Sequence, residues 1–310
     1  MKKFVRFLKA LPPTNTTPIT IMLLLLATSP LSFAAGVRIP YANNVGDSYM
    51  GIFYAPLGAQ MLIYPYYVSA DYMWDQDGRK VDIDLDAEGL LFRPAYHIRL
   101  NEKTTLYLNG VVPLGRVSIK NPATGRRETS TGVGDVVLVP SIWYTFSKEK
   151  KFGMQLDCLF TVPVGDYKKE RLVNMGNNQF SAEPMLILAK GWQLESSELY
   201  SELKFSYLYN SENSDEHFEQ GDMSQIMVNV GYITGKITTG FTALYESSVN
   251  EDKFHGRKIP NSKARLAEVG SSLTYQISPK MNFYLRLSQV IEGENTAKTT
   301  TVMGKLWFAF

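Results

Sequence analysis

The stretch that decides the fold is residues 281–310, which read MNFYLRLSQVIEGENTAKTTTVMGKLWFAF. Apolar and polar side chains alternate over its first part: Met281, Phe283, Leu285 and Leu287 share one face, and Asn282, Tyr284, Arg286 and Ser288 share the other. Alternation with a period of two is the pattern of a β-strand with one apolar face. Read back from the C-terminus, Phe310, Phe308 and Leu306 also share a face. This stretch therefore predicts two amphipathic strands joined by a short polar connection.

The same alternation continues upstream in long segments. Residues 225–232 place Ile226, Val228, Val230 and Tyr232 opposite Gln225, Met227 and Asn229. The segments are longer than soluble strands, which average about 5 or 6 residues, and they meet the ~9 to 11 residues that a tilted strand needs to cross a bilayer. Strand length therefore favours a membrane barrel over a soluble sandwich with a similar alternation.

Two kinds of connection take turns along the chain. The short ones are Asn101–Lys103, Lys148–Lys151, Glu195–Glu198, Gly235–Lys236 and Ser278–Lys280. The longer polar ones are Asp75–Arg79, Lys120–Thr131, Lys168–Asn177, Glu212–Gln220 and Asn250–Ser262, with a tight one near Glu294. Outer-membrane barrels have short periplasmic turns and longer extracellular loops. The sequence predicts an all-β transmembrane antiparallel β-barrel of about twelve strands over residues 59–310, with both termini in the periplasm.

The N-terminal residues have a different composition. A basic start with Lys2, Lys3, Arg6 and Lys9 precedes the apolar run Ile19–Ala27 and the small residues of Ser32–Ala34. This order predicts a signal peptide over residues 1–34 with cleavage before Ala35. The alternative is a retained anchor, but the apolar run is shorter than the ~20 residues of a spanning helix. Residues 35–58 are expected to form a periplasmic or plug-like segment.

Removing that signal peptide changes the charge balance. The chain has 32 basic and 30 acidic residues, so the loss of four basic ones leaves 28 against 30, a net charge of −2. A nucleic-acid partner is therefore not indicated. The single Cys158 excludes an intrachain disulfide framework.

The final strand carries a second indication. A terminal amphipathic strand that ends on an aromatic ring can pair through its free edge with another sheet and seat the ring at the membrane interface. We therefore expect Phe310, Phe308 and Leu306 to be an assembly signal for the barrel assembly machinery, and we expect the protein to lie in the cell outer membrane of a Gram-negative bacterium. Outer-membrane lipids and lipopolysaccharide are its expected surroundings.

Several motifs resemble one family. They are Ala59–Val81, Arg93–His97, Thr131–Asp135, Val162–Tyr167 and Leu172–Asn178. The sequence resembles the outer-membrane family associated with the meta-pathway of phenol degradation, over most of the mature chain. The resemblance implies a barrel proposed to pass small aromatic or other hydrophobic compounds.

An enzyme is the main alternative from another class, because some outer-membrane barrels are lipid hydrolases that use Ser and His. The chain has His97, His217 and His255, but His217 and His255 fall among charged loop residues and His97 lies beside Arg93 and Arg99. A Gly-x-Ser-x-Gly motif does not occur. We predict no catalytic residues, no cofactor and no metal site.

The inward faces of the strands would carry the function. The expected lumen-lining residues are Asp86, Glu88, Arg93, Asp157, Glu183, Glu202, Lys204, Glu268, Arg286 and Trp307. Neither sign of charge dominates, whereas a strongly ion-selective pore has a ring of one sign. The mixture favours passage of a small hydrophobic or aromatic solute through a monomeric or weakly oligomeric channel. A closed structural barrel, with its lumen filled by side chains and salt bridges, is the second hypothesis.

Overall fold

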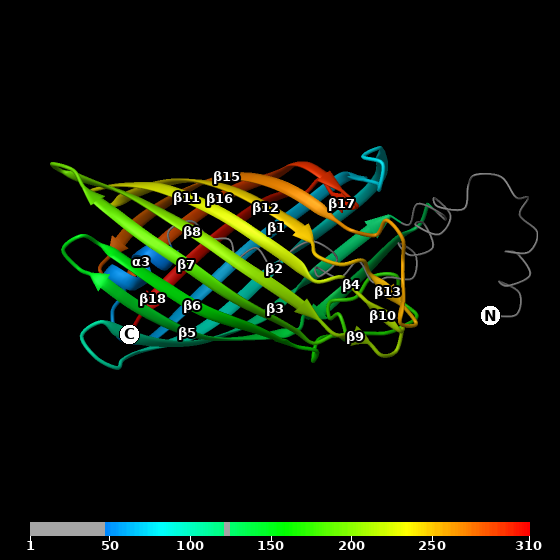
Figure 1. Cartoon of the computed structure of the whole chain (residues 1–310), viewed down its shortest axis with the longest axis horizontal. Coiled ribbons are helices and arrows are strands. Elements are labelled where there is room, and N and C mark those ends of the chain that lie inside the picture. The colour runs from blue at the N-terminus through cyan, green and yellow to red at the C-terminus, as the bar shows by residue number, and fades with distance from the viewer. Residues whose placement is uncertain (1–46, 121–124) are drawn as a thin grey trace, which may run out of the picture.

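The computed structural model describes residues 47–120 and 125–310. The predicted signal peptide, residues 1–34, and the first part of the predicted plug-like segment lie outside the described residues. The described chain forms a closed antiparallel barrel of 12 strands, as predicted (Figure 1). These strands are β1 (Gly58–Trp74), β2 (Lys80–Arg99), β3 (Thr104–Lys120), β5 (Val136–Ser147), β6 (Phe152–Val162), β7 (Ser181–Gln193), β8 (Ser197–Asn210), β11 (Met223–Thr234), β12 (Ile237–Ser248), β15 (Arg265–Ser278), β16 (Met281–Glu294) and β18 (Thr300–Ala309).

The barrel closes between its first and last strands. Gln60 of β1 pairs with Ala309 of β18, and the antiparallel ladder continues to Ser69 and Thr300. The backbone N–H of Phe310 donates to the carbonyl of Ala59 at 3.1 Å. Closure leaves the sheet without an exposed edge, which is required of a spanning β-structure because lipid offers no hydrogen bonds.

The two ends of the barrel differ as the sequence predicts. At one end, hereafter the short-turn end, connections such as 235–236 and 279–280 join adjacent strands directly. Gly235 has φ 54, a conformation that glycine adopts without steric cost. At the other end, the long-loop end, the connections carry small strands: β4 (Arg127–Val133), β9 (Glu212–Asn213), β10 (Phe218–Glu219), β13 (Lys253–Phe254), β14 (Arg257–Lys258) and β17 (Thr296–Ala297).

One expected loop is partly strand. We predicted a polar loop over Lys120–Thr131, but β3 extends to Lys120 and β4 begins at Arg127. In the hairpin of β3 and β4 the outward polar side chains are exposed, whereas Val117 and Ile119 are buried on the inner face, so polar residues are compatible with a strand here. At Gly134 and Asp135 the chain then passes from β4 to β5, and both strands pair with β3.

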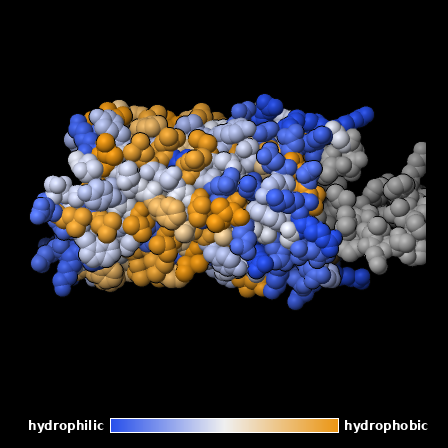
Figure 2. Space-filling model, turned by 90° about the horizontal axis from the view of Figure 1, so that it is seen from above, coloured by the Kyte–Doolittle hydropathy of each residue, from blue (hydrophilic) through white to orange (hydrophobic). Residues whose placement is uncertain are grey.

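The outer wall carries an apolar belt between two polar ends (Figure 2). Along β11 the outward side chains are at least 40% exposed: Ile226, Val228, Val230 and Tyr232. The inward side chains Gln225, Met227 and Asn229 are at most 4% exposed. The predicted alternation of this segment is confirmed. An apolar belt of outward side chains is what a strand presents to lipid.

The described part of the chain contains no helix that is both long and apolar enough to cross a membrane. The helix α3 (Asp47–Tyr54) has 8 residues.

Candidate functional site in the barrel lumen

The short helix α3 lies inside the barrel at the short-turn end, near the C-terminus (Figure 1). It contacts β5, β6, β7 and β8. Its Tyr49 is fully buried and stacks on Tyr200 of β8, with ring centroids 4.8 Å apart and planes 5° apart. Glycines of the wall make room: a Cβ on Gly191 would lie 1.9 Å from the Tyr49 hydroxyl, and one on Gly231 would lie 2.1 Å from the Tyr200 ring. The wall is therefore shaped to receive this helix.

Polar contacts hold α3 in place. The Tyr49 N–H donates to a Glu202 carboxylate oxygen at 2.6 Å, and the Tyr54 hydroxyl donates to Glu198 at 2.6 Å. The Tyr49 hydroxyl also donates to Glu198, which forms an ion pair with Lys151. Accepting the Tyr49 N–H satisfies one of the backbone donors that the first turn of a helix leaves unpaired.

A further ion pair joins the start of α3 to the last strand. The Asp47 carboxylate pairs with the Lys305 ammonium of β18. Side chains of β8 and β18 and of the turn at Lys151 thus hold Asp47, Tyr49 and Tyr54, so the position of the helix depends on contacts between its own side chains and the wall.

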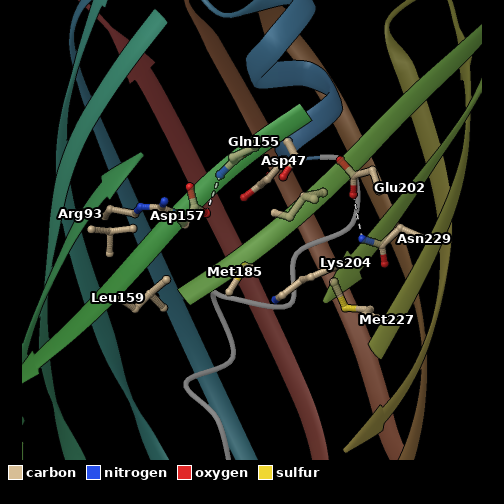
Figure 3. A pocket seen from close by; sticks show the side chains of 13 residues that line it. Asp47, Arg93, Gln155, Asp157, Leu159, Met185, Glu202, Lys204, Met227 and Asn229 are labelled. Carbon is tan, nitrogen blue, oxygen red and sulfur yellow. Dashed lines mark hydrogen bonds between the residues drawn. The ribbon is translucent and has the colours of Figure 1, made fainter. Parts of the chain in front are cut away.

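The middle of the lumen has a small cavity of about 50 Å³ that is lined by both signs of charge (Figure 3). Arg93 and Lys204 face it together with Asp47, Asp157 and Glu202. Glu202 accepts from the Asn229 amide at 2.7 Å, and Asn229 in turn accepts from the Thr242 hydroxyl at 2.9 Å. Because both signs of charge are present, the lining shows no ring of one sign.

The inner wall differs from one side to the other. Strands β1 to β7 contribute most of the buried apolar side chains, such as Val68 and Val111, although the buried Arg93 also lies on β2. Strands β8 to β16 contribute a larger share of buried polar side chains, such as Glu246 and Arg286, beside several apolar ones. A solute in the lumen would therefore touch a more apolar surface on one side and a more polar surface on the other.

At the long-loop end the connection 163–180 folds inward. Leu172, Val173 and Met175 are at most 8% exposed and belong to the same apolar cluster as the β1 to β7 wall. Loops in water do not normally bury such side chains. This connection narrows the lumen from the end opposite to α3.

Two aspartates fix that connection to the break between β4 and β5. The Asp135 carboxylate accepts the N–H of Gly165 at 2.9 Å and the N–H of Asn177 at 2.6 Å. The Asp166 carboxylate accepts the N–H of Val133 at 3.1 Å. A Cβ on Gly176 would lie 2.8 Å from the Asp135 carboxylate, so only glycine fits there. The glycine and aspartate motifs of the sequence thus serve to hold a backbone junction.

Most of the predicted lumen residues lie on the inner wall. Arg93, Glu183, Glu202, Lys204 and Arg286 are at most 9% exposed. Asp157 lines the central cavity, and Glu268 forms an ion pair with Arg286. Trp307 lines a second cavity beside α3 and donates its Nε1–H to Gln60 at 2.8 Å. Of the predicted assembly-signal residues, Phe310 is 75% exposed and Leu306 and Phe308 lie partly buried in β18.

Two residues require a correction. We expected Asp86 and Glu88 in the lumen, but they lie on the outer wall, on the same face as Leu90 and opposite the buried Ala87. Glu88 pairs with Arg116 at 3.5 Å, and Asp86 pairs with Arg127 at 3.2 Å. The strand β2 continues above the apolar belt, where outward charges meet water and the cost of a charge in hydrocarbon does not arise.

Sequence reasoning missed the docking residues. Glu198 was placed in a turn, and neither Tyr49 nor Asp135 was assigned a role in shaping the lumen. The sequence did contain one indication of this junction, since a Gly-Asp pair occurs at 134–135 and again at 165–166. In the structure the two pairs lie together at one junction.

Comparisons with known proteins agree with this architecture. The profile of the family described as "Putative MetA-pathway of phenol degradation" matches residues 70–306. The crystal structure of the COG4313 outer membrane channel from Pseudomonas putida F1 is similar over 84% of this chain and 98% of that chain, with a TM-score of 0.74 and 20% identity.

Two other barrels are less similar. The β domain of the Bordetella autotransporter BrkA has a TM-score of 0.49 and 9% identity, with 82% of this chain and 99% of that chain covered. The KdgM porin in complex with disordered oligogalacturonate has a TM-score of 0.45 and 12% identity, with 80% and 99% covered. No curated protein matches the sequence. The closed barrel and its apolar belt place the protein in the outer membrane.

Proposed function

Since the chain belongs to the family described as the putative MetA-pathway of phenol degradation, we propose that it is an outer-membrane channel for small hydrophobic or aromatic compounds. The observation that supports this most is the two-sided lumen. The wall from β1 to β7 is the more apolar one and the wall from β8 to β16 is the more polar one, and buried Arg286 is paired with the opposite charge of Glu268. A neutral aromatic compound with one polar substituent can contact both walls. An ion would be attracted by some lining charges and repelled by others, because both signs are present.

Catalysis finds no support in the positions of the histidines. The Nδ1 of His97 faces the carbonyl oxygen of Pro56 at 3.0 Å, and the Nδ1 of His217 faces Glu212 at 2.9 Å. His217 also stacks on His255, with ring centroids 4.6 Å apart. None of these partners is a nucleophile, so a barrel hydrolase is the weaker proposal.

The orientation follows from the loop asymmetry. We propose that the short-turn end faces the periplasm and the long-loop end faces the outside of the cell, as in other outer-membrane barrels. An epitope inserted in the connection 249–264 should be reached by antibody on intact cells. Labelling only after permeabilisation of the outer membrane would invert this topology.

The test of transport is the ion current of the purified, folded protein in a planar bilayer. We expect small single-channel currents that are interrupted when phenol or toluene is added, because a solute in the narrowed lumen blocks ions. Glycerol at the same concentration is the matched polar solute and should interrupt the current less often.

The second hypothesis is a closed structural barrel, and the packing of α3 and of residues 171–176 in the lumen favours it. It predicts no current under any condition. Current that glycerol and toluene interrupt equally would instead show an open channel without preference for hydrophobic solutes.

A further inference from the structure

Four strands of the barrel carry a proline whose side chain is exposed on the outer wall: Pro65 of β1, Pro94 of β2, Pro140 of β5 and Pro184 of β7. Proline has no N–H to donate to a neighbouring strand, so within sheets it is confined mainly to edges, strand ends and bulges. A closed barrel has no edge, and these prolines lie inside their strands. Their positions therefore require an explanation.

The ladder is interrupted beside each of these prolines. Between β5 and β6 the pairing stops at Leu138 with Phe160 and resumes at Ser141 with Asp157, without a change of register. The ladders β1–β18, β2–β3 and β7–β8 are each interrupted in the same way, whereas the ladder β11–β12 is continuous. Lipid offers no other donor to the carbonyl opposite a proline. The wall therefore has fewer hydrogen bonds at these four places, hereafter called seams.

The seams differ on their inner face. Three of them place a charged side chain toward the lumen between the interrupted pairs: Arg93, Glu183 or Lys305, all at most 9% exposed. The β5–β6 seam places Val139 and Leu159 there, which are at most 8% exposed and both line the central cavity. A hydrophobic solute can pass between these two apolar side chains without displacing a buried charge.

On its outer face the β5–β6 seam meets the apolar belt. Pro140 and Cys158 lie opposite each other on this face. Their outward neighbours along the two strands, Leu138, Ile142 and Leu156, are at least 43% exposed. Only the gap between two strands therefore separates apolar side chains of the cavity from the lipid.

Both ends of the lumen are narrowed, by α3 at the short-turn end and by the connection 163–180 at the long-loop end. Transfer of apolar surface from water into lipid is favourable. For a hydrophobic solute in the lumen, a passage through the wall leads directly to the more favourable surroundings.

We propose that the β5–β6 seam is a lateral passage, through which a hydrophobic solute moves between the lumen and the lipid. The two strands separate locally between Leu138 and Ser141. Because Pro140 gives no N–H, this separation breaks one hydrogen bond fewer than it would elsewhere along the ladder. The inference rests on the proposed function, since it supplies the route of the solute.

The first test supplies the missing donor. In the Pro140→Ala variant a backbone N–H faces the opposite carbonyl and completes the ladder. We expect separation of the strands to become about fivefold rarer, the value of one hydrogen bond, and uptake of a hydrophobic solute to slow by the same factor. Pro94→Ala is the matched control, because it completes the β2–β3 seam, where Arg93 faces the lumen, and should leave uptake unchanged.

Uptake is measured on cells of a Gram-negative host that produce the full-length protein. The probe is N-phenyl-1-naphthylamine, a neutral aromatic compound whose fluorescence rises when it enters lipid. Heat-modifiable mobility on a gel verifies that each variant has folded, and cells with equal amounts of folded barrel are compared.

The second test closes the seam covalently. Cys158 is the one cysteine of the chain, so Pro140→Cys creates a single pair of thiols across the seam. Opposite residues of an antiparallel ladder have Cα atoms about 4.5 to 5.5 Å apart, a distance that a disulfide bridges. Oxidation with copper–phenanthroline should lower uptake to the level of cells without the barrel. Dithiothreitol should restore the level of the unoxidised variant.

A matched disulfide joins two strands whose ladder is continuous. Val228→Cys and Ala243→Cys, combined with Cys158→Ser, place it at an opposite pair of β11 and β12 on the outer wall. Its oxidation should not change uptake. The ion current of the purified Pro140→Cys variant should also survive oxidation, because ions move along the barrel axis.

Three results would refute the lateral passage: unchanged uptake after oxidation of the Pro140→Cys variant, wild-type uptake in the Pro140→Ala variant, or an equal loss with the β11–β12 disulfide. A loss of ion current together with uptake would show that the disulfide closes the lumen instead of the wall, and it would refute the proposal too. If one Pro140 variant does not fold, the other decides the question.

Failure of the proposed function gives a different result. Cells with the wild-type barrel would then take up the probe no faster than cells without it, and both the transport role and the lateral passage would be lost. Rapid uptake by the wild type that neither Pro140 variant slows keeps the transport role and removes only the passage through the wall.

Discussion

The two ends of the lumen are filled by different kinds of structure. At the short-turn end, α3 is tied to the wall mainly by side chains, with Glu198, Glu202 and Lys305 as the main partners. At the long-loop end, the connection 163–180 is tied through its own backbone, whose N–H groups donate to Asp135. Release of α3 leaves one identified backbone donor, the Tyr49 N–H, without its partner Glu202, while the turn of the helix keeps its own backbone bonds. Release of the connection 163–180 leaves two, the N–H groups of Gly165 and Asn177, so we treat this connection as part of the wall.

The largest expected effect comes from removing α3. Deletion of residues 47–54 should leave the barrel ladder intact and raise the single-channel conductance several-fold, because the helix occupies the short-turn end of the lumen. Heat-modifiable mobility on a gel verifies that the barrel has folded. If the folded deletion variant conducts like the wild type, α3 is not the constriction, and the connection 163–180 limits the current instead.

The next effect concerns the backbone junction at the other end. In an Asp135→Asn variant one carboxylate oxygen is replaced by an NH₂ group, which cannot accept the backbone N–H that it faces. The loss should destabilise the docked connection by roughly 2 to 3 kcal/mol. We expect trypsin to cleave the folded barrel after Arg171, which is half-buried in the wild type. Asp77→Asn is the control, because Asp77 lies in an exposed turn far from the connection 163–180 and pairs with Arg79 at 2.7 Å. Equal resistance of both variants to trypsin would show that Asp135 does not hold the connection.

A smaller effect separates docking of α3 from formation of α3. Replacing glycine by alanine inside a helix normally stabilises the helix by about 1 kcal/mol. In Gly51→Ala the added Cβ would lie 2.2 Å from the Trp143 ring, so the helix must move away from the wall. We expect a conductance between those of the wild type and the α3 deletion. Gly110→Ala is the control, because its Cβ would meet no atom closer than 3.5 Å. A wild-type conductance for Gly51→Ala would mean that the wall yields instead of the helix.

The sequence was sufficient for the barrel and insufficient for what fills it. Alternation as in Ile226 to Tyr232 reports which side chains meet lipid, and lipid is a uniform solvent, so each strand can be interpreted alone. Above the belt the alternation of β2 is inverted, because the acidic side chains face water on the outside and the apolar Ile83 and Ala87 are buried on the inside. That is why Asp86 and Glu88 were assigned to the wrong face.

The docking of α3 could not be predicted for a different reason. Its partners are distant in sequence: Tyr49 and Glu202 are 153 positions apart. Nothing in the composition of residues 47–54 indicates that a tyrosine there will stack on Tyr200 or that glycines of β7 and β11 will receive it. Contacts of this kind depend on the assembled wall.

The last test does not concern conductance and asks whether the long loops share the rigidity of the wall. In the connection 249–264, Asp252 accepts the N–H of Gly221 at 2.7 Å and thereby joins two long loops. Burial of this carboxyl raises its pKa from 3.8 to about 6, although the bond from Gly221 opposes the shift. Because the pKa is higher in the folded loops, the protonated form stabilises them below about pH 4, and that stabilisation is lost as the pH rises through 6. A shift of this size corresponds to roughly 3 kcal/mol.

Hydrogen exchange at the Gly221 and Ile259 amides, corrected for the intrinsic rate, should therefore show more protection at pH 4.5 than at pH 7.5. The Asp252→Asn variant keeps a hydrogen-bond acceptor and removes the titrating group. Protection of its Gly221 and Ile259 amides should therefore change between the two pH values no more than that of the Leu62 amide in β1, which serves as the internal control. If the wild type and the variant respond to pH alike, other groups control these loops, and the ion pair of Lys253 with Glu219 is the next to change.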